Sequence, residues 1–177
     1  AVDALIKDRC KTQPCTELVM PTGNNFANDM HARFASNDSI DSAFQFGWQI
    51  KPDDRTSSYL EIWLPPDRDP NGWTVTVTPP LGSDPGLETS IPVSADPLLK
   101  DGDPRRFIEL EQDGKNIGQR SADKHLNNRW RVMLAMIPTA GNLGEGRRTP
   151  VGLWTIHIDT GTDPLCQGDH IDIWVQR

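Results

Sequence analysis

Asn24 is the first residue whose type and position point to chemistry. The apolar run Thr16–Met20 ends in the turn Pro21-Thr22-Gly23-Asn24. A strand that ends in Gly-Asn can direct a carboxamide N–H at the oxygen of a tetrahedral intermediate, provided the donor lies about 3 Å from that oxygen. We therefore take Asn24 as a candidate oxyanion-hole donor for acyl transfer. The alternative is an ordinary turn, because Asn and Gly are frequent turn residues.

A second motif with possible chemistry is Asp159-Thr160-Gly161. Two Asp-Thr-Gly motifs in one active site would provide a pair of carboxylates that share a proton. The sequence holds no second copy, and the motif lies between two predicted strands. We therefore interpret it as a hairpin turn that begins at Asp159.

The four histidines show no i, i+4 pair of the kind that binds zinc. His157 alternates with Trp154 and Ile156, which places it on the polar face of a strand. His31 is expected at a junction between two parts of the chain, and the alternative is a catalytic base.

Aspartates in predicted loops are the candidate ligands for a cation, since Ca²⁺ prefers hard oxygen ligands. No EF-hand spacing is present, and Asp is also a common turn residue. We therefore predict no cofactor and keep calcium as an alternative. The loop aspartates concerned are Asp53, Asp54, Asp67, Asp69, Asp101 and Asp103.

The three cysteines are Cys10, Cys15 and Cys166, an odd number that leaves at least one unpaired within the chain. Cys10 and Cys15 can close a small loop around Pro14. A reactive or metal-binding thiol is the alternative, although no zinc-type spacing is present. The cysteines do not indicate a cellular compartment.

Composition limits the classes of partner. The chain has 177 residues and a net charge of −7, with scattered Lys and Arg, so we expect no nucleic-acid surface, which needs clustered cations. No apolar stretch approaches the roughly 20 residues that span a bilayer, so we expect no membrane partner. Fifteen Pro and fourteen Gly favour short strands joined by turns.

Most of the chain alternates apolar and polar residues with a period of two, which indicates half-buried strands. Asp113-Gly114 is the strongest hairpin signal, because both residues tolerate positive φ. Strand spacing after residue 40 is typical of a β-sandwich, with a jelly roll as the preferred variant. The predicted strands are 43–50, 59–64, 73–78, 89–92, 107–111, 116–120, 129–137, 152–158 and 170–175.

The N-terminal part has a different pattern. Residues 1–9 carry apolar side chains at helical spacing, and the short apolar strand 17–20 follows. A helix before a buried strand is typical of an α/β unit. We therefore divide the chain into a helix–strand piece, residues 1–38, and a β-sandwich, residues 39–177.

The six tryptophans suggest a packed core and one possible recognition site. Trp48, Trp63, Trp130, Trp154 and Trp174 lie within predicted strands and are expected to fill the core. For Trp73, which follows the turn Asn71-Gly72, core packing is the preferred interpretation, and an exposed aromatic platform that binds glycan or peptide is the alternative.

These features together resemble the subtilisin-like serine proteases. The resemblance rests on the run from the N-terminal helix through Pro21–Asn24 to His31-Ala32, and on the strands 149–156 and 172–177. Thr22 departs from the motif, in which Ala is more usual. In one branch of this family a β domain is inserted between the oxyanion strand and the nucleophile.

The resemblance implies a non-catalytic region of a subtilisin-like endopeptidase that supplies Asn24 and an accessory jelly roll. Its partners would be the rest of the catalytic domain and a peptide or protein substrate. No Gly-Thr-Ser segment and no His-Gly pair is present, so none of the triad residues is expected here. The alternatives are a stand-alone β-sandwich that binds glycan or protein and, third, a capsid-type jelly roll that assembles.

Overall fold

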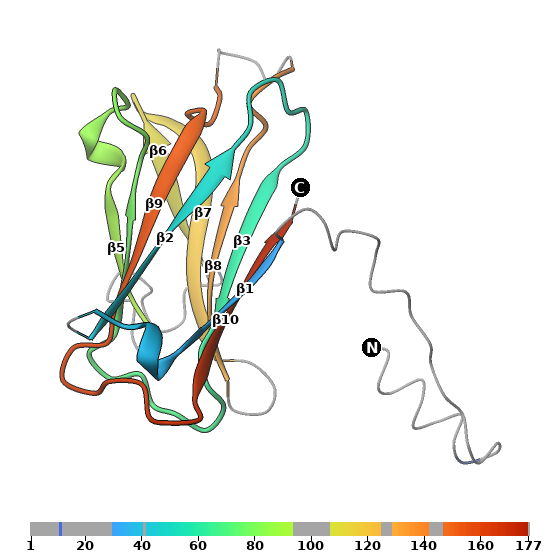
Figure 1. The fold of residues 1–177 in the computed structure, drawn as a ribbon. Coiled ribbons are helices and arrows are strands. Elements are labelled where there is room, and N and C mark those ends of the chain that lie inside the picture. Colours follow the sequence, from blue (N-terminus) through green and yellow to red (C-terminus); the bar gives the residue numbers. More distant parts are fainter. Residues whose placement is uncertain are drawn as a thin grey trace.

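The computed structural model describes residues 11, 30–40, 42–93, 107–124, 129–141 and 147–176. Their strands form two antiparallel sheets, which confirms the predicted mainly β sandwich (Figure 1). In the described part, no helix is long and apolar enough to cross a membrane. The strands are β1 (His31–Ala35), β2 (Ala43–Ile50), β3 (Ser58–Trp63), β4 (Thr74–Thr78), β5 (Thr89–Pro92), β6 (Ile108–Gln112), β7 (Lys115–Lys124), β8 (Trp130–Met136), β9 (Gly152–Asp159) and β10 (His170–Gln176).

The order of the strands is that of a jelly roll. The six-stranded sheet runs β1-β10-β3-β8-β7-β6 and the four-stranded sheet runs β2-β9-β4-β5. Early strands therefore pair with late ones in a nested series: β1 with β10, β2 with β9, β3 with β8 and β4 with β5. The hairpin β6–β7 extends the larger sheet beside β8. Such nesting arises when one long antiparallel ribbon wraps into two layers.

The core lies between the two sheets, where alternate residues of each strand face inward. On β3 and β8, for example, Leu60 faces its register partner Leu134, and both are fully buried. On the opposite sheet Val75 pairs with Ile158, also fully buried. One continuous apolar cluster results, and burial of this kind stabilises a fold by about 25 cal/mol per Å² of apolar area.

Turn chemistry closes the hairpin between β6 and β7 as predicted. Asp113 and Gly114 adopt φ values of 52° and 69°. Positive φ at both central residues gives the right twist for a two-residue hairpin, and Asp-Gly tolerates it. The motif Asp159-Thr160-Gly161 also forms a turn, in which Asp159 Oδ1 accepts a hydrogen bond from the Gly161 N–H at 2.7 Å. The interpretation of this motif as a turn is confirmed, but the turn does not close a hairpin, because β9 and β10 belong to different sheets.

Strand β1 was not among the predicted strands. It pairs antiparallel with β10, with His31 opposite Trp174 and Arg33 opposite Asp172. β1 lies within the segment assigned from sequence to the helix–strand piece. The division at residue 38 stays a prediction, because residues 12–29 lie outside the described part.

The tryptophans agree with expectation in part: Trp63, like Trp174, was assigned to the core, yet it is half-buried outside the core cluster, on the outer face of the six-stranded sheet. Trp73 is buried, with 1% of its surface exposed, because its indole N–H donates to the Asp163 carbonyl at 2.9 Å and Arg68 lies over its ring. Core packing of Trp73, the preferred interpretation, is therefore confirmed, and the alternative of an exposed platform is wrong. Trp174 was assigned to the core, yet it is 46% exposed. Trp174 lies two residues after Asp172 on β10, so both side chains project from the outer face of the six-stranded sheet.

The chain enters and leaves the sandwich at one place. β1 begins the described sandwich and β10 ends it, and the two strands lie side by side (Figure 1). The Val175 N–H donates to the Met30 carbonyl at 2.9 Å. The first and last residues of this unit are thus held together by the sheet itself.

Candidate functional site

The residue predicted to take part in acyl transfer, Asn24, lies outside the described residues, as do Cys10, Cys15 and His125. Its role as an oxyanion donor stays a prediction. Within the described part, the polar side chains gather instead around β1 and β10. This region forms the candidate site.

A single buried carboxylate organises the site. Asp172 Oδ1 accepts from Arg33 Nε at 2.9 Å, and His31 Nε2 lies 3.3 Å from the same oxygen. Asp172 Oδ2 accepts from Arg129 Nη2 at 3.2 Å, and His170 Nε2 lies 3.4 Å away. We call these five residues the Asp172 cluster. It joins two guanidinium groups and two imidazoles to one carboxylate whose side chain is 9% exposed.

The sheet register explains why these side chains meet. In an antiparallel sheet, residues directly opposite each other project on the same face. Asp172 lies opposite Arg33 on β1 and opposite Trp63 on β3. Arg129 reaches the cluster from the residue before β8, where its Nε donates to the Leu64 carbonyl at 2.7 Å.

The surroundings of Asp172 also set its protonation. Burial raises the pKa of Asp172, but hydrogen bonds from Arg33, Arg129 and His31 outweigh this effect and hold the pKa below its ordinary value. The carboxylate is therefore ionised at neutral pH. It balances one of its two guanidinium partners, which leaves the cluster with a surplus of positive charge even when both histidines are neutral.

An aromatic and charged row continues across the outer face of the sheet. Trp63 Nε1 donates to Glu61 Oε2 at 2.8 Å. The Cζ atoms of Arg129 and Arg131 lie 5.8 and 5.5 Å from the Trp63 ring centre, a geometry in which cations are attracted to the ring. Arg131 also bridges Glu61 and Asp123 at 3.4 and 3.3 Å. This row ties β3, β7 and β8 together on the face opposite the core.

Trp174 completes the outer face next to the Asp172 cluster. Its ring stacks on His31 with centroids 4.0 Å apart and an angle of 26°. The stack leaves one face of the indole toward solvent, and Tyr59 on neighbouring β3 is also exposed. Exposed aromatic side chains beside cations are typical of binding surfaces.

A second charged centre lies in the loops at the end of the sandwich. Arg68, whose side chain is 11% exposed, donates to Asp163 Oδ1 at 2.6 Å and to Asp169 Oδ2 at 2.8 Å. It also donates to the Pro164 carbonyl at 2.6 Å and to Cys166 Sγ at 3.3 Å. Arg68 thereby fixes the loop that leads into β10.

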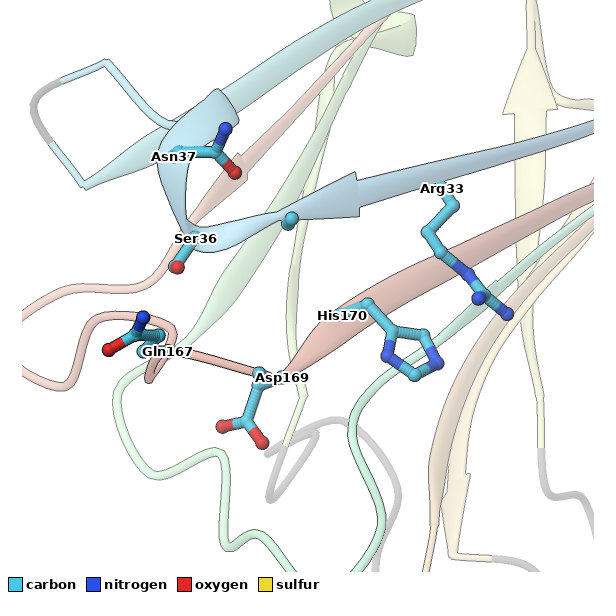
Figure 2. A pocket seen from close by; sticks show the side chains of 8 residues that line it. Arg33, Ser36, Asn37, Gln167, Asp169 and His170 are labelled. Carbon is cyan, nitrogen blue, oxygen red and sulfur yellow. The ribbon is translucent and has the colours of Figure 1, made fainter.

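An open pocket lies between that loop and the end of β1. Its volume is about 560 Å³. Figure 2 shows Arg33 and His170 at one end and Ser36, Asn37 and Gln167 toward the other. The Asp169 carboxylate in its wall is held by Arg68. The wall therefore carries one carboxylate, from Asp169, and one guanidinium, from Arg33, which is 57% exposed.

The other predicted chemistry is not assembled in the described part. No three His, Cys, Asp or Glu side chains in these ranges gather to hold a metal ion; the expectation of no cofactor stays a prediction, with calcium as its alternative. His157 lies on the polar side of β9, half-buried between the buried Ile156 and Ile158. Cys166 is a free, exposed cysteine. Sequence reasoning missed Arg33, Arg129 and Asp172.

Comparison with known proteins gives one weak structural neighbour to report. No protein-family model matches the chain. No curated protein matches it either. A solved structure described as "Structure of the Clostridium Perfringens CspB protease" is similar with a TM-score of 0.49 and 13% sequence identity. The match covers 86% of this chain and 26% of that chain. The chain thus spans about a quarter of its neighbour's length, and a similarity at this score carries no argument by itself.

Proposed function

We propose that this chain is a non-catalytic region of a subtilisin-like serine endopeptidase. The described jelly roll is an accessory domain inserted into the catalytic domain, and Asn24 supplies an oxyanion-hole amide. The observation that carries the proposal is the pairing of β1 with β10, which brings the two ends of the sandwich together. A domain whose ends are adjacent can be inserted into a loop of another domain without separating that loop's ends.

The position of Asn24 in the chain supports the same proposal. Met30, where the described sandwich begins, comes six residues after Asn24. Six residues span at most about 20 Å even when fully extended. The corner formed by β1 and β10 would therefore lie within about 20 Å of the reacting carbonyl, and the Asp172 cluster lies at that corner.

Alone, the chain would not form an acyl-enzyme. An oxyanion donor stabilises a transition state, but a nucleophile and a base must first create it. We expect no labelling of the chain by a fluorophosphonate probe. Covalent modification of a serine in this chain would contradict the proposal.

The decisive variant is Asn24→Ala in the intact protease. Loss of one oxyanion donor lowers kcat by about 10²–10³-fold, the size of the effect in subtilisin, with KM little changed. Asn25→Ala is a matched control, because it removes an identical side chain from the next position. Equal kcat values for the two variants would identify Asn24 as a turn residue and overturn the assignment.

A second candidate is a stand-alone module that binds glycan or protein. The exposed Trp174 and Tyr59 on the outer face favour it, since solvent-exposed aromatic side chains often anchor partners. It predicts saturable binding that Trp174→Ala removes and that does not depend on any protease domain. Glycan-array and pull-down experiments without binding would count against it.

A further inference from the structure

The Asp172 cluster has one guanidinium more than it has carboxylates, whereas the neighbouring row of Glu61, Asp123 and Arg131 has one carboxylate more. The chain carries a net charge of −7, yet Asp172 is bound to both Arg33 and Arg129. One carboxylate cannot neutralise two guanidinium groups. Arg33 uses its Nε for Asp172, and its side chain is 57% exposed. The Arg33 guanidinium is thus accessible at the β1 edge, away from Glu61 and Asp123, and it favours an acidic partner there.

Among the strands that the structure describes, the one that carries these residues lies at an edge of the six-stranded sheet. β1 is the outermost strand beside β10. The Val175 N–H bonds to the Met30 carbonyl, and in antiparallel pairs such bonds recur at every second residue. Ala32 and Phe34 therefore direct their backbone groups toward β10. His31 and Arg33 direct theirs away from it, where an added strand would pair.

From these two observations we infer that β1 binds an extended, acidic segment of a partner polypeptide by strand addition. Backbone hydrogen bonds to His31 and Arg33 supply the pairing, as in other cases of β-augmentation. Acidic side chains on the outer face lie opposite Arg33 and His31. Opposite charges across neighbouring strands are favourable, whereas like charges are not.

The surroundings of β1 extend this recognition in both directions. At one end of the strand, the exposed ring of Trp174 stacks on His31 and offers apolar contact to the partner. At the other end, the pocket of about 560 Å³ beside Arg33 offers the polar side chains of Ser36 and Asn37 (Figure 2). A segment bound along β1 therefore contacts an aromatic ring, a cation and a polar pocket in turn.

The inference is independent of the proposed protease role. It names a partner for β1 whether the sandwich is an inserted domain or a separate module. Asn24→Ala should leave this binding unchanged, and the binding variants below do not test kcat. Failure of one proposal therefore does not imply failure of the other.

The test titrates the full chain with the peptide acetyl-Glu-Val-Glu-Val-Glu-amide, whose alternate residues present carboxylates on one face. We expect saturable binding that weakens with added salt, because exposed charges are screened. In NMR spectra, bound peptide should slow hydrogen exchange of the His31 and Arg33 amides. Equal binding of the Gln-Val-Gln-Val-Gln peptide, or binding without this protection, would overturn the inference.

Matched variants assign the effect to Arg33. We expect Arg33→Gln to bind the acidic peptide about fivefold more weakly and Arg33→Lys, which keeps the charge, to restore binding. Arg55→Gln is the control for loss of an exposed positive charge. Arg55 lies on the loop before β3, whereas Trp63, which is opposite Asp172, lies at the other end of that strand. Each variant must also unfold at the same temperature as the wild type, which shows that it is folded. Unchanged affinity of a folded Arg33→Gln, or pairing of β1 edges between two copies of the chain, would contradict the inference.

Discussion

Two charged centres in this molecule are both built from guanidinium and carboxylate groups, but one has a single guanidinium at its centre and the other a single carboxylate. Arg68 is one cation bound by two carboxylates and by backbone carbonyls. Asp172 is one carboxylate bound by two guanidinium groups and approached by two imidazoles. Both central groups are nearly buried, but their partners differ. Arg68 joins loop to loop, whereas Asp172 leaves a positive surplus on an exposed edge.

The comparison separates a structural role from a recognition role. The carboxylates around Arg68 satisfy its charge, and its contact with Trp73 places the guanidinium over a buried ring. Around Asp172 the charge is not balanced within the cluster, and Arg33 and Trp174 face solvent. We therefore expect loss of Arg68 to affect stability most, and changes around Asp172 to affect binding more than folding.

Arg68→Ala should produce the largest loss of stability. The variant removes several charge-assisted hydrogen bonds and a packing contact with Trp73, so the free energy of unfolding should fall by about 3 kcal/mol. Urea denaturation measures it. Arg55→Ala, an exposed arginine, should stay within about 0.5 kcal/mol of the wild type. A loss below about 1 kcal/mol for Arg68→Ala would show that the loop folds without its central cation.

Asp172→Ala should have a smaller effect, about 2 kcal/mol. Its removal leaves two guanidinium groups without a shared partner. Because the Arg33 side chain is already 57% exposed, water can hydrate it, and the loss of stability is limited. Glu109→Ala is the control for loss of a surface carboxylate, because Glu109 is an exposed residue of β6. If Asp172→Ala destabilised the fold more than Arg68→Ala, the proposed division of roles would be reversed.

The pH dependence of stability should isolate Asp172 from its neighbours. The folded-state pKa of Asp172 lies below its ordinary value of 3.8, so its ionised form stabilises the fold. This contribution is fully present above pH 3.8 and is lost as the pH falls through the lower folded-state pKa. Urea unfolding at a series of pH values should show the wild type and Asp172→Asn converging in acid. A constant difference between them would contradict the assigned pKa direction.

Fluorescence quenching should show the smallest effect, one of local charge without a change in stability. Arg33, which is diagonal to Trp174 in the β1–β10 register, should attract iodide and repel caesium, so iodide should quench the exposed indole more strongly at equal concentration although Glu61 lies opposite it on β3. Trp174→Phe should remove most of this difference while altering the free energy of unfolding by less than about 0.5 kcal/mol. Equal quenching by the two ions would argue against a positive surface at this corner.

The sequence predicts the strands of the sandwich because the alternation of apolar and polar residues follows the alternation of buried and exposed side chains along a strand. Trp73 to Thr78 and Trp130 to Met136 carry apolar residues on one face, and the structure buries Val75, Val77 and Leu134 there. The sequence analysis does not predict β1, because His31 and Arg33 occupy the outer face of this strand. Charged residues are frequent on edge strands, where they oppose unwanted pairing, and they weaken the apolar pattern.

The candidate site needs information that local sequence does not hold. Arg33 and Asp172 are 139 residues apart, and Arg129 reaches the same carboxylate from another sheet position. Only the nested pairing of strands brings them together. The exposure of Trp174 could have been predicted from the local sequence. Along β10 it falls on the same face as Asp172, whereas Ile171 and Ile173 fall on the buried face. For Trp73, the turn before it left exposure open as an alternative, and only the distant Asp163, whose carbonyl accepts from the indole N–H, accounts for its burial.

The most direct test of the central proposal is the complete reading frame around this chain. The account predicts that it continues past Arg177 into a Gly-Thr-Ser segment that provides the nucleophile. It also predicts an aspartate segment and a His-Gly segment upstream of Ala1, in the order Asp, His, Ser of subtilisin-like enzymes. A reading frame without these segments on either side would contradict the protease assignment and leave the β1 edge and Trp174 as the site to pursue.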